Sequence, residues 1–347
     1  MKLLLAGISL IVSLAAVEGL LAIFHVDTMR QIHFSVRATS CRSDPELIWT
    51  FVPKISGSWG SGEFTEVMRI NSLGMRETEI EPKRPGEERV LAIGDSFTYG
   101  HGVKQDESYP RVLEGLLRAR GYPARVLNGG QSGYGMDQSY KMFVTRRIDL
   151  APDLLLVGIH CTDVVDDVDE SLYDIRGGDL VPLDARHNWI YLQDELFWGA
   201  PKVVRNLKSY RLLLGVLDRR DPYRQLPRLG EMELRAWQRK KIVLEVARLR
   251  ELGAARGFRV LVILMPCNQD LEASPPDLYL ELADRIAELG VPVLRGIDEL
   301  RARSPDVARL FFRTDMHLNP EGDRVLAASI ADFIVREHAL PGATGGG

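Results

Sequence analysis

Residues 91–103 read LAIGDSFTYGHGV. The apolar run in this stretch stops at Gly94, and Asp95 and Ser96 follow. A short apolar run that ends at a glycine predicts a buried strand followed by a tight turn. A serine at such a turn is either an activated nucleophile or an ordinary turn residue. A nucleophilic serine needs a base, a group that orients the base, and donors for an oxyanion, so the rest of the chain decides between the two.

Apolar runs of strand length recur along the chain and alternate with segments of helical spacing. The strand-like runs span residues 89–93, 124–128, 153–159, 259–265 and 291–294. The helical segments span residues 109–117, 140–148, 232–256 and 276–289, and a last helix is expected to start at Asn319 and Pro320. The alternation predicts an α/β fold, a three-layer α/β/α sandwich with a five-stranded parallel, flavodoxin-like sheet.

The chain divides into four expected parts. We expect a signal anchor or signal peptide over residues 1–24, a segment packing on the main domain over 25–88, that domain over 89–337, and a disordered tail over 338–347. An insertion at about residues 165–230 follows the third strand and contains a hairpin around Gly177 and Gly178. Its aromatic residues are expected to pack it onto the domain rather than to line a cleft: Trp189, Tyr191, Phe197 and Trp198.

The N-terminal hydrophobic helix is the most unusual segment. Residues 3–24 are apolar apart from glycine, serine and Glu18. The stretch is long enough to span a bilayer, and it also has the composition of a secretory signal. A buried helix of a soluble protein is the less favoured third interpretation, because the apolar residues show no amphipathic period. Either main interpretation sends the rest of the chain across a membrane, so the membrane is an expected partner.

Composition limits the other partners and the redox chemistry. The 347-residue chain has a formal net charge of −4 and no basic stripe, which gives no indication of nucleic-acid binding. Cys161 and Cys267 each follow a predicted strand, a placement that is compatible with proximity at one end of the sheet. Two unpaired buried thiols are the favoured interpretation, a disulfide the alternative, and Cys41 is left over in both cases. The cysteines and histidines show no metal-site spacing.

Polar residues follow the predicted strands. In an open parallel sheet, ligands bind beyond the carboxyl ends of the strands, so these residues should gather at one edge. They are residues 94–96, 128–133, 160–163, 266–268 and 313–322.

Three of these stretches resemble sequence blocks of the SGNH/GDSL hydrolase family. GDSF at residues 94–97 is similar to the nucleophile block, NGGQSGYG at 128–135 to the second block, and TDMHLNPEG at 314–322 to the last block in its Asp-x-His form. RINSLGMR at residues 69–76 is similar to a membrane-anchored bacterial branch of the family. The resemblance covers roughly residues 68–337.

The resemblance implies a catalytic triad, with Ser96 as nucleophile, His317 as base and Asp315 orienting the imidazole. In an extended segment, residues two apart point to the same side, so Asp315 can reach the ring of His317. The implied oxyanion donors are the backbone N–H groups of Ser96 and Gly133. Thr162 stands where the family has an asparagine, and its shorter, rotating hydroxyl is the third and weaker candidate donor.

Other polar residues near this edge receive no catalytic role. Asp95 is expected to hold the turn through its side chain, and no role is assigned to His101 or His160. The acidic residues after the third strand are expected to form a solvated loop rather than a cation site: Asp163, Asp166, Asp167, Asp169 and Glu170. We therefore expect neither a metal ion nor a cofactor.

The function implied by the resemblance is that of a serine esterase or deacylase. It would hydrolyse or transfer O-acyl esters of an envelope carbohydrate or lipid through an acyl-serine intermediate. The catalytic domain would be extracytoplasmic, in the periplasm or at the cell surface. The alternative is a non-catalytic SGNH-like protein that binds an envelope glycan or a partner protein, which Thr162 and the aromatic insertion would favour.

Overall fold

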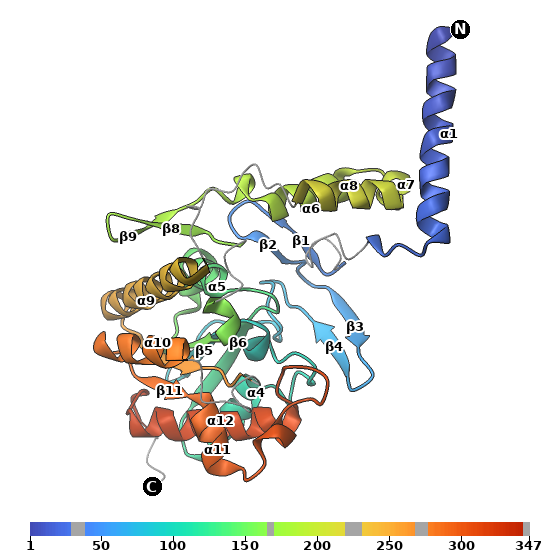
Figure 1. The fold of residues 1–347 in the computed structure, drawn as a ribbon. Helices are drawn as coiled ribbons and strands as arrows, with labels where there is room; N and C mark the ends of the chain where they lie inside the picture. Colours follow the sequence, from blue (N-terminus) through green and yellow to red (C-terminus); the bar gives the residue numbers. More distant parts are fainter. Residues whose placement is uncertain (29–38, 165–169, 219–230, 268–276, 343–347) are drawn as a thin grey trace. The chain divides into compact units, whose positions relative to one another are not determined.

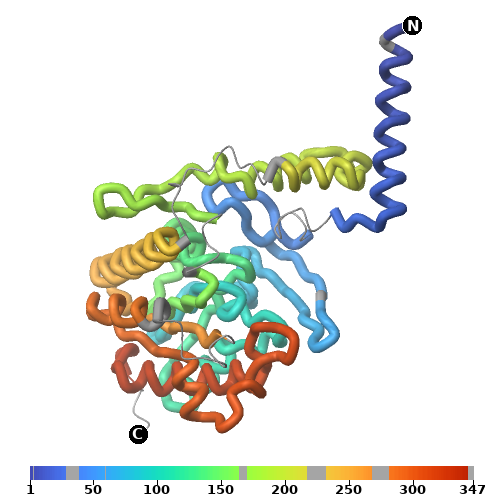
Figure 2. The backbone as a smooth tube through the Cα atoms, in the orientation of Figure 1, coloured from blue at the N-terminus to red at the C-terminus, as the bar shows by residue number. Residues whose placement is uncertain are grey.

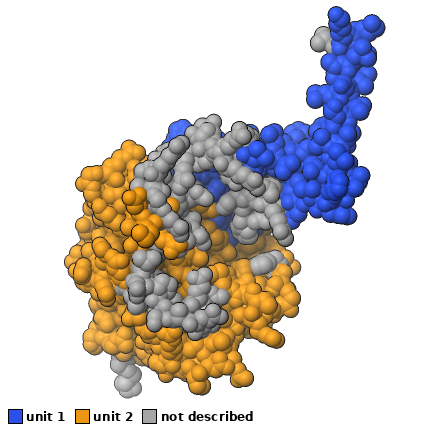
Figure 3. Space-filling view, in the orientation of Figure 1, with its two compact units in different colours: residues 1–51, 184–227 blue, residues 52–183, 228–347 orange. Residues whose placement is uncertain are grey.

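The computed structural model describes residues 1–28, 39–164, 170–218, 231–267 and 277–342. Contacts divide the chain into two compact units (Figure 3). Unit 1 combines residues 1–51 with 184–227, and unit 2 combines residues 52–183 with 228–347.

A five-stranded parallel sheet forms the centre of unit 2 (Figure 1). Its strands are β5 (Glu88–Gly94), β6 (Ala124–Gly130), β7 (Leu154–Ile159), β10 (Arg259–Leu264) and β11 (Val293–Arg295). They lie in the order β11-β10-β7-β5-β6, which is the flavodoxin-like order. Every residue of β5 and β7 is buried, because helices cover both faces of the sheet.

The helices form the two outer layers of unit 2 (Figures 1 and 2). One face of the sheet carries α4 (Tyr109–Ala119), α11 (Gly296–Arg303) and α12 (Pro320–Arg336), and the other carries α5 (Met136–Met142), α9 (Glu231–Arg256) and α10 (Asp277–Glu288). A hydrophobic core lies on each face of the sheet, and alternate residues of β5 enter the two cores. Val90 and Ala92 pack on one face, and Leu91 and Ile93 pack on the other. The predicted fold class is therefore confirmed.

Two antiparallel hairpins extend unit 2 beyond the sheet. The expected hairpin around Gly177 and Gly178 is present as β8 (Tyr173–Arg176) and β9 (Asp179–Pro182), with φ of 60° and 86° at the two glycines. A second hairpin, β3 (Ser56–Gly60) and β4 (Thr65–Arg69), includes the Gly/Ser-rich stretch, which carries no strand pattern in the sequence.

A buried ion pair ties the β8–β9 hairpin to the helical layer. The ammonium group of Lys241 on α9 lies 2.9 Å from the carboxylate of Asp137 on α5 and donates to the hydroxyl of Ser171 at 3.0 Å. The same carboxylate accepts the backbone N–H of Leu172 at 2.7 Å and that of Tyr173 at 3.2 Å. One buried charge pair thus fixes the start of β8.

The end of the chain partly contradicts the predicted tail. Residues 338–342 pack on unit 2, with Ala339 only 2% and Leu340 only 5% exposed, because both side chains join the core next to α12. Residues 343–347 lie outside the described residues.

Unit 1 contains the apolar helix α1 (Lys2–Ile23), the hairpin of β1 (Cys41–Asp44) and β2 (Ile48–Phe51), and helices from the insertion. These helices are α6 (Trp189–Gly199), α7 (Lys202–Arg205) and α8 (Lys208–Asp218). A small core formed by Phe197 and Leu214, with Trp198 and Tyr210 packed against it, joins α6 to α8. The aromatic residues of the insertion that enter this core pack its own helices together, and the predicted packing of the insertion onto the main domain stays a prediction.

Helix α1 is long and apolar enough to cross a membrane. The span Leu4–Ile23 has a mean hydropathy of 2.2, and none of it is buried. This exposure is opposite to what a core helix of a soluble protein would show.

Candidate active site

The nucleophile candidate lies at a tight turn between β5 and α3 (Ser96–Tyr99). Gly94 ends the strand with φ of 152°, and Asp95 caps the short helix by accepting the N–H of Phe97 at 2.9 Å. Asp95 thus has the turn-holding role predicted for it. Burial raises the pKa of this carboxyl group to about 6, although the positive charge of His317 acts in the opposite direction.

Glycines on the neighbouring strands allow this short helix to lie directly on the strand ends. A Cβ atom at Gly158 of β7 would lie 2.6 Å from Oγ1 of Thr98. A Cβ atom at Gly130 of β6 would meet the backbone nitrogen of Tyr99. Any larger residue would therefore push α3, and Ser96 with it, away from the edge of the sheet.

The structure brings Ser96, His317 and Asp315 together in one hydrogen-bonded chain. Nε2 of His317 lies 2.7 Å from Oγ of Ser96, and Nδ1 of the same ring lies 2.5 Å from Oδ1 of Asp315. Asp315 also accepts the backbone N–H of His317 at 3.0 Å. These bonds hold the pKa of the Asp315 carboxyl group down at about 2, so it is ionised at neutral pH.

Backbone hydrogen bonds join the two ends of the loop that carries Asp315 and His317. The N–H of Phe312 donates to the carbonyl of His317 at 3.0 Å, and Phe311 pairs with Leu318 in an isolated bridge. Asn319 caps α12 through the N–H of Glu321 at 3.0 Å and also donates to the carbonyl of Phe311 at 3.0 Å. The predicted helix start at Asn319 therefore also fixes the loop in front of it.

Glu63, between β3 and β4, braces the same loop from outside. Its carboxylate accepts the N–H of Arg313 at 2.9 Å and both the N–H and the hydroxyl of Thr314, at 2.8 Å and 2.7 Å. Hydrogen bonds from Thr314 lower the pKa of Glu63. The sequence analysis missed this residue, because a single glutamate in a Gly/Ser-rich stretch carries no signal.

Arg76 holds the loop that follows α3. Its buried guanidinium donates to the carbonyls of Tyr99 at 3.1 Å and Val103 at 2.7 Å, and also to that of Gly100. Glu66 of β4 pairs with Arg76 at 3.5 Å and accepts the N–H of Gly102 at 3.0 Å. Arg76 is the last residue of the RINSLGMR stretch, which the sequence singled out by resemblance alone.

Aromatic rings surround the imidazole of His317. The ring of Phe97 lies 4.7 Å and the ring of His101 4.3 Å from it, centroid to centroid. His160 stacks on Phe97 at 4.2 Å. Burial lowers the pKa values of His101 and His160 to about 3. Both rings are therefore neutral near pH 7; the ring of His101 packs beside that of His317, and the ring of His160 packs on Phe97.

The candidate oxyanion donors lie at the same edge. Gly133, with φ of 89°, belongs to the turn after β6, where the N–H of Gln131 donates to the carbonyl of Gly94 at 3.0 Å. The hydroxyl of Thr162 lies 2.8 Å from Nδ1 of His160. Thr162 is thus already engaged with a neighbouring side chain.

The cysteine expectation was wrong. Cys161 and Cys267 form a disulfide, with Cα atoms 6.3 Å apart, rather than two separate thiols. The cause is the strand order, because β7 and β10 are neighbours in parallel register and each cysteine lies just beyond its strand. Cys41 takes no part in this bond.

Two groups of side chains in the described chain have the spacing of metal ligands. His101 with Asp315 and His317 forms one group, and His160 with Cys161 and Cys267 forms the other. The first combines the hydrogen-bonded pair of Asp315 and His317 with the neighbouring ring of His101, and the second contains disulfide sulfurs, which are not thiolate ligands. Of the acidic loop, Asp163 accepts the N–H of His160 at 2.8 Å, and Asp166, Asp167 and Asp169 lie outside the described residues.

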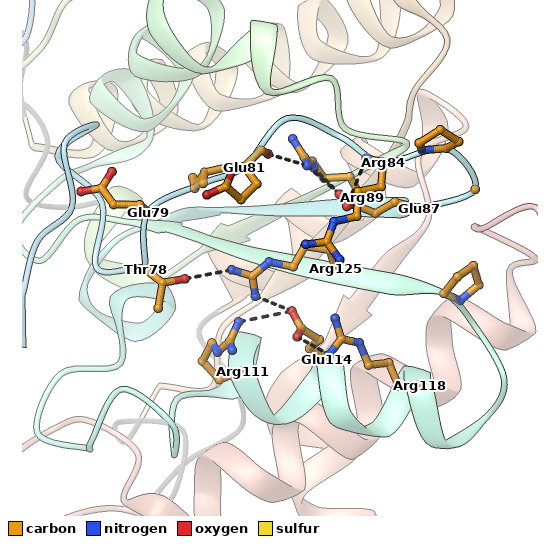
Figure 4. Close-up of a pocket in the computed structure, with 14 residues that line it drawn as sticks. Thr78, Glu79, Glu81, Arg84, Glu87, Arg89, Arg111, Glu114, Arg118 and Arg125 are labelled. Carbon is orange, nitrogen blue, oxygen red and sulfur yellow. Dashed lines mark hydrogen bonds and ion pairs between the residues drawn. The ribbon is translucent and has the colours of Figure 1, made fainter.

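A cavity of about 600 Å³ lies at the opposite edge of the sheet from Ser96, near the amino ends of β5 and β6. Figure 4 shows that its arginines face glutamates, with Arg111 and Arg125 both directed at Glu114. Arg125 also pairs with Glu77 at 3.1 Å and Arg89 with Glu87 at 2.7 Å. Arg111, Arg118 and Arg125 thus share the carboxylates of Glu77 and Glu114.

Comparisons by sequence found no matching family profile and no matching curated protein. Comparison with solved structures found a protein named TesA, with TM-score 0.43 and 12% identity over 71% of this chain and 98% of that chain. A lipase/acylhydrolase from Enterococcus faecalis has a TM-score of 0.42 and 13% identity, over 75% of this chain and 100% of that chain. An acetylxylan esterase, Axe2 from Geobacillus stearothermophilus, has a TM-score of 0.42 and 13% identity, over 71% of this chain and 94% of that chain. Likeness at this level does not establish a shared activity, so the assignment of function depends on the geometry of the site.

Proposed function

We propose that the protein is a serine ester hydrolase of the SGNH type. One observation carries the proposal: Oγ of Ser96, the imidazole of His317 and the carboxylate of Asp315 form a continuous hydrogen-bonded chain, with distances of 2.7 Å and 2.5 Å. A serine hydroxyl is a weak nucleophile until a base removes its proton, and this arrangement supplies the base and its orienting group.

In the acylation step, Nε2 of His317 takes the proton of Ser96 while Oγ attacks the ester carbonyl carbon. The ionised carboxylate of Asp315 stabilises the resulting imidazolium. The imidazolium then gives its proton to the leaving alkoxy oxygen, the C–O bond to the alcohol breaks, and the acyl group remains on Ser96.

In the deacylation step, His317 removes a proton from water, the hydroxide oxygen attacks the acyl carbon, and Ser96 leaves with the proton returned by the imidazole. If a sugar hydroxyl replaces water, the same steps transfer the acyl group. The oxyanion of both intermediates would be held by the N–H groups of Ser96 and Gly133, with Thr162 as a third donor.

The proposed substrate is an O-acyl ester of an envelope carbohydrate or lipid. Two features support an extracytoplasmic location: α1 can cross a membrane, and a disulfide joins Cys161 to Cys267. Disulfides persist in oxidising compartments and are rare in the cytosol.

The proposal is tested with the full-length chain in detergent and p-nitrophenyl acetate as substrate. We expect ester hydrolysis by the native chain and a decrease of about 10⁴-fold or more in kcat for Ser96→Ala, because the nucleophile is lost. Ser304→Ala, which removes a serine at the end of α11, is the matched control and should keep the native rate. Equal hydrolysis by the native chain and Ser96→Ala would refute the proposal.

A second candidate function, non-catalytic binding, is favoured by Thr162, whose hydroxyl is engaged with His160. If Thr162 is a working donor, Thr162→Val should lower kcat by about 10²-fold or more. In that case Thr162→Asn, which restores the residue found in the family, should retain or raise kcat. If the native chain shows no measurable ester hydrolysis, and neither Thr162→Val nor Thr162→Asn produces any, the binding function is favoured.

A further inference from the structure

Helix α8 of unit 1 is attached to the C-terminal half of α1 by Glu18. Its carboxylate accepts the N–H of Lys208 at 2.9 Å and that of Ser209 at 2.7 Å, which are the first free N–H groups of α8. The ammonium group of Lys208 donates to the carbonyls of Leu21 at 3.3 Å and Val26 at 3.2 Å. A carboxylate that is unusual in an apolar helix thus has a defined partner, and α8 starts beside the last turns of α1.

The segment that contains α7 and α8 is basic. Residues 202–218, which include both helices, contain four basic residues, Lys202, Arg205, Lys208 and Arg211, and one acidic residue, Asp218. Lys202 is exposed, Arg205 lies 4.8 Å above the ring of Trp198, and Arg211 donates to the carbonyl of Arg205 at 2.9 Å. Among the described side chains, none of these three forms an ion pair with a carboxylate.

The same segment exposes large apolar side chains. Val203 is 77% exposed, and Leu213 and Val216, which are three residues apart on α8, are 53% and 44% exposed. The opposite face of α8 is covered, since Leu214 is only 2% exposed in the core with Phe197. One face of α8 therefore packs inside unit 1, and the other combines exposed apolar groups with neighbouring positive charge.

We propose that α7 and α8 lie in the headgroup layer of the membrane that α1 enters, where they bind anionic phospholipids. Basic residues next to exposed apolar side chains are the features of a helix that lies at a membrane surface. The hydrogen bonds of Glu18 and Lys208 place the start of α8 at the end of α1, and therefore near the level at which α1 leaves the bilayer. Lys202, Arg205 and Arg211 meet the lipid phosphates, and Val203, Leu213 and Val216 enter the acyl boundary.

Continuity with α1 favours a lipid surface over a protein partner for this face. An anionic lipid surface attracts each nearby Lys or Arg by about 1 kcal/mol, which corresponds to about fivefold in binding. This inference concerns attachment and does not depend on the ester hydrolase activity.

The test uses the full-length chain in vesicles, with a bimane fluorophore on Val216→Cys and, as a control, on Val335→Cys. Both are partly exposed valines on helices, 44% and 37% exposed. The vesicles are phosphatidylcholine alone or with about one third phosphatidylglycerol, and carry lipids brominated high on the acyl chain as quenchers. We expect the 216 label to be quenched more strongly than the 335 label. The difference should grow with phosphatidylglycerol and shrink in high salt, because screening weakens the attraction.

A charge variant separates lipid binding from mere proximity. Lys202→Glu should reduce the effect of phosphatidylglycerol on the 216 label, whereas Lys240→Glu, on exposed α9 surface, should not. The proposal would be overturned if the 216 label were quenched no more strongly than the 335 label. It would also be overturned if quenching of the 216 label did not depend on phosphatidylglycerol. A 216 label shielded from water but not quenched by lipid would indicate a protein partner and would also overturn it.

Discussion

Both ring nitrogens of His317 are engaged, Nδ1 with Asp315 and Nε2 with Ser96. In the neutral ring only one nitrogen carries a proton, and the ionised Asp315 selects Nδ1 for it. Nε2 is then the acceptor that faces Oγ of Ser96. The neutral rings of His101 and Phe97 pack beside the imidazole, so they fix its plane without competing for its proton.

His160 predicts a specific pH dependence of stability. Its folded-state pKa is about 3, whereas an unfolded histidine titrates near ~6.5. Between these values the unfolded chain binds a proton that the folded chain does not, so stability is complete above about pH 6.5 and falls as the pH decreases. The loss is about 1.4 kcal/mol per pH unit for one such group. Asp95, whose raised pKa is about 6, acts in the opposite direction.

The measurement is the thermal midpoint of the full-length chain between pH 7 and pH 5. His160→Gln should flatten the decrease towards acid, even if its midpoint at pH 7 is lower, whereas exposed His187→Gln should keep the native slope. Identical slopes for the native chain and His160→Gln would show that His160 is not buried in its neutral form.

The candidate triad residues could be named from the sequence, and the residues that hold them in place could not. Ser96, Asp315 and His317 were named because their short blocks resemble those of the SGNH/GDSL family, and their catalytic roles stay a prediction. Glu63 acts through contacts with residues 313–314, which depend on tertiary structure. The disulfide of Cys161 was missed for the same reason, since strand order decides which ends are neighbours.

At the scale of elements, the five strands of the sheet were predictable because each contains a short apolar run, which in β5 and β7 is buried along its whole length. The hairpin of β3 and β4 was not, because the stretch at residues 56–60 lacks alternation and forms its ladder with residues 65–69. Its position matters for the site, since it carries Glu63 and Glu66 to the loops beside Ser96 and His317.

This role of the hairpin predicts a kinetic effect of Glu63→Ala. We expect kcat for an ester substrate to fall by about 10–100-fold with little change in KM, because the loop before Asp315 loses three hydrogen bonds and the triad is misplaced. Thermal stability should change little, since Glu63 is at the surface. Glu288→Ala, at an exposed position on α10, is the control. A native kcat for Glu63→Ala would contradict a bracing role.

The buried ion pair between Asp137 of α5 and Lys241 of α9 predicts that removing its cation destabilises the fold. Lys241→Met leaves the carboxylate of Asp137 buried without its cation, which should cost about 3–5 kcal/mol in the free energy of unfolding. Chemical denaturation of the full-length chain in detergent measures this cost. The exposed neighbour provides the control, since Lys240→Met should change the free energy by less than about 0.5 kcal/mol. Equal stability of the two variants would contradict the buried pair.

At the scale of the whole molecule, the chain combines an α/β unit that holds the proposed active site with a second unit that contains the membrane-crossing candidate. The association of residues 1–51 with 184–227 could not be predicted, because it joins segments far apart in the sequence. The insertion after the third strand thus contributes to both units.

The central claim is that Ser96 is activated by His317 and Asp315. A fluorophosphonate reacts covalently with activated serines, and mass spectrometry of the digested protein identifies the modified residue. We predict one adduct, on Ser96, with a labelling rate that falls by at least about 10³-fold in His317→Ala. An unlabelled Ser96, or labelling at the same rate in the native chain and His317→Ala, would contradict the account.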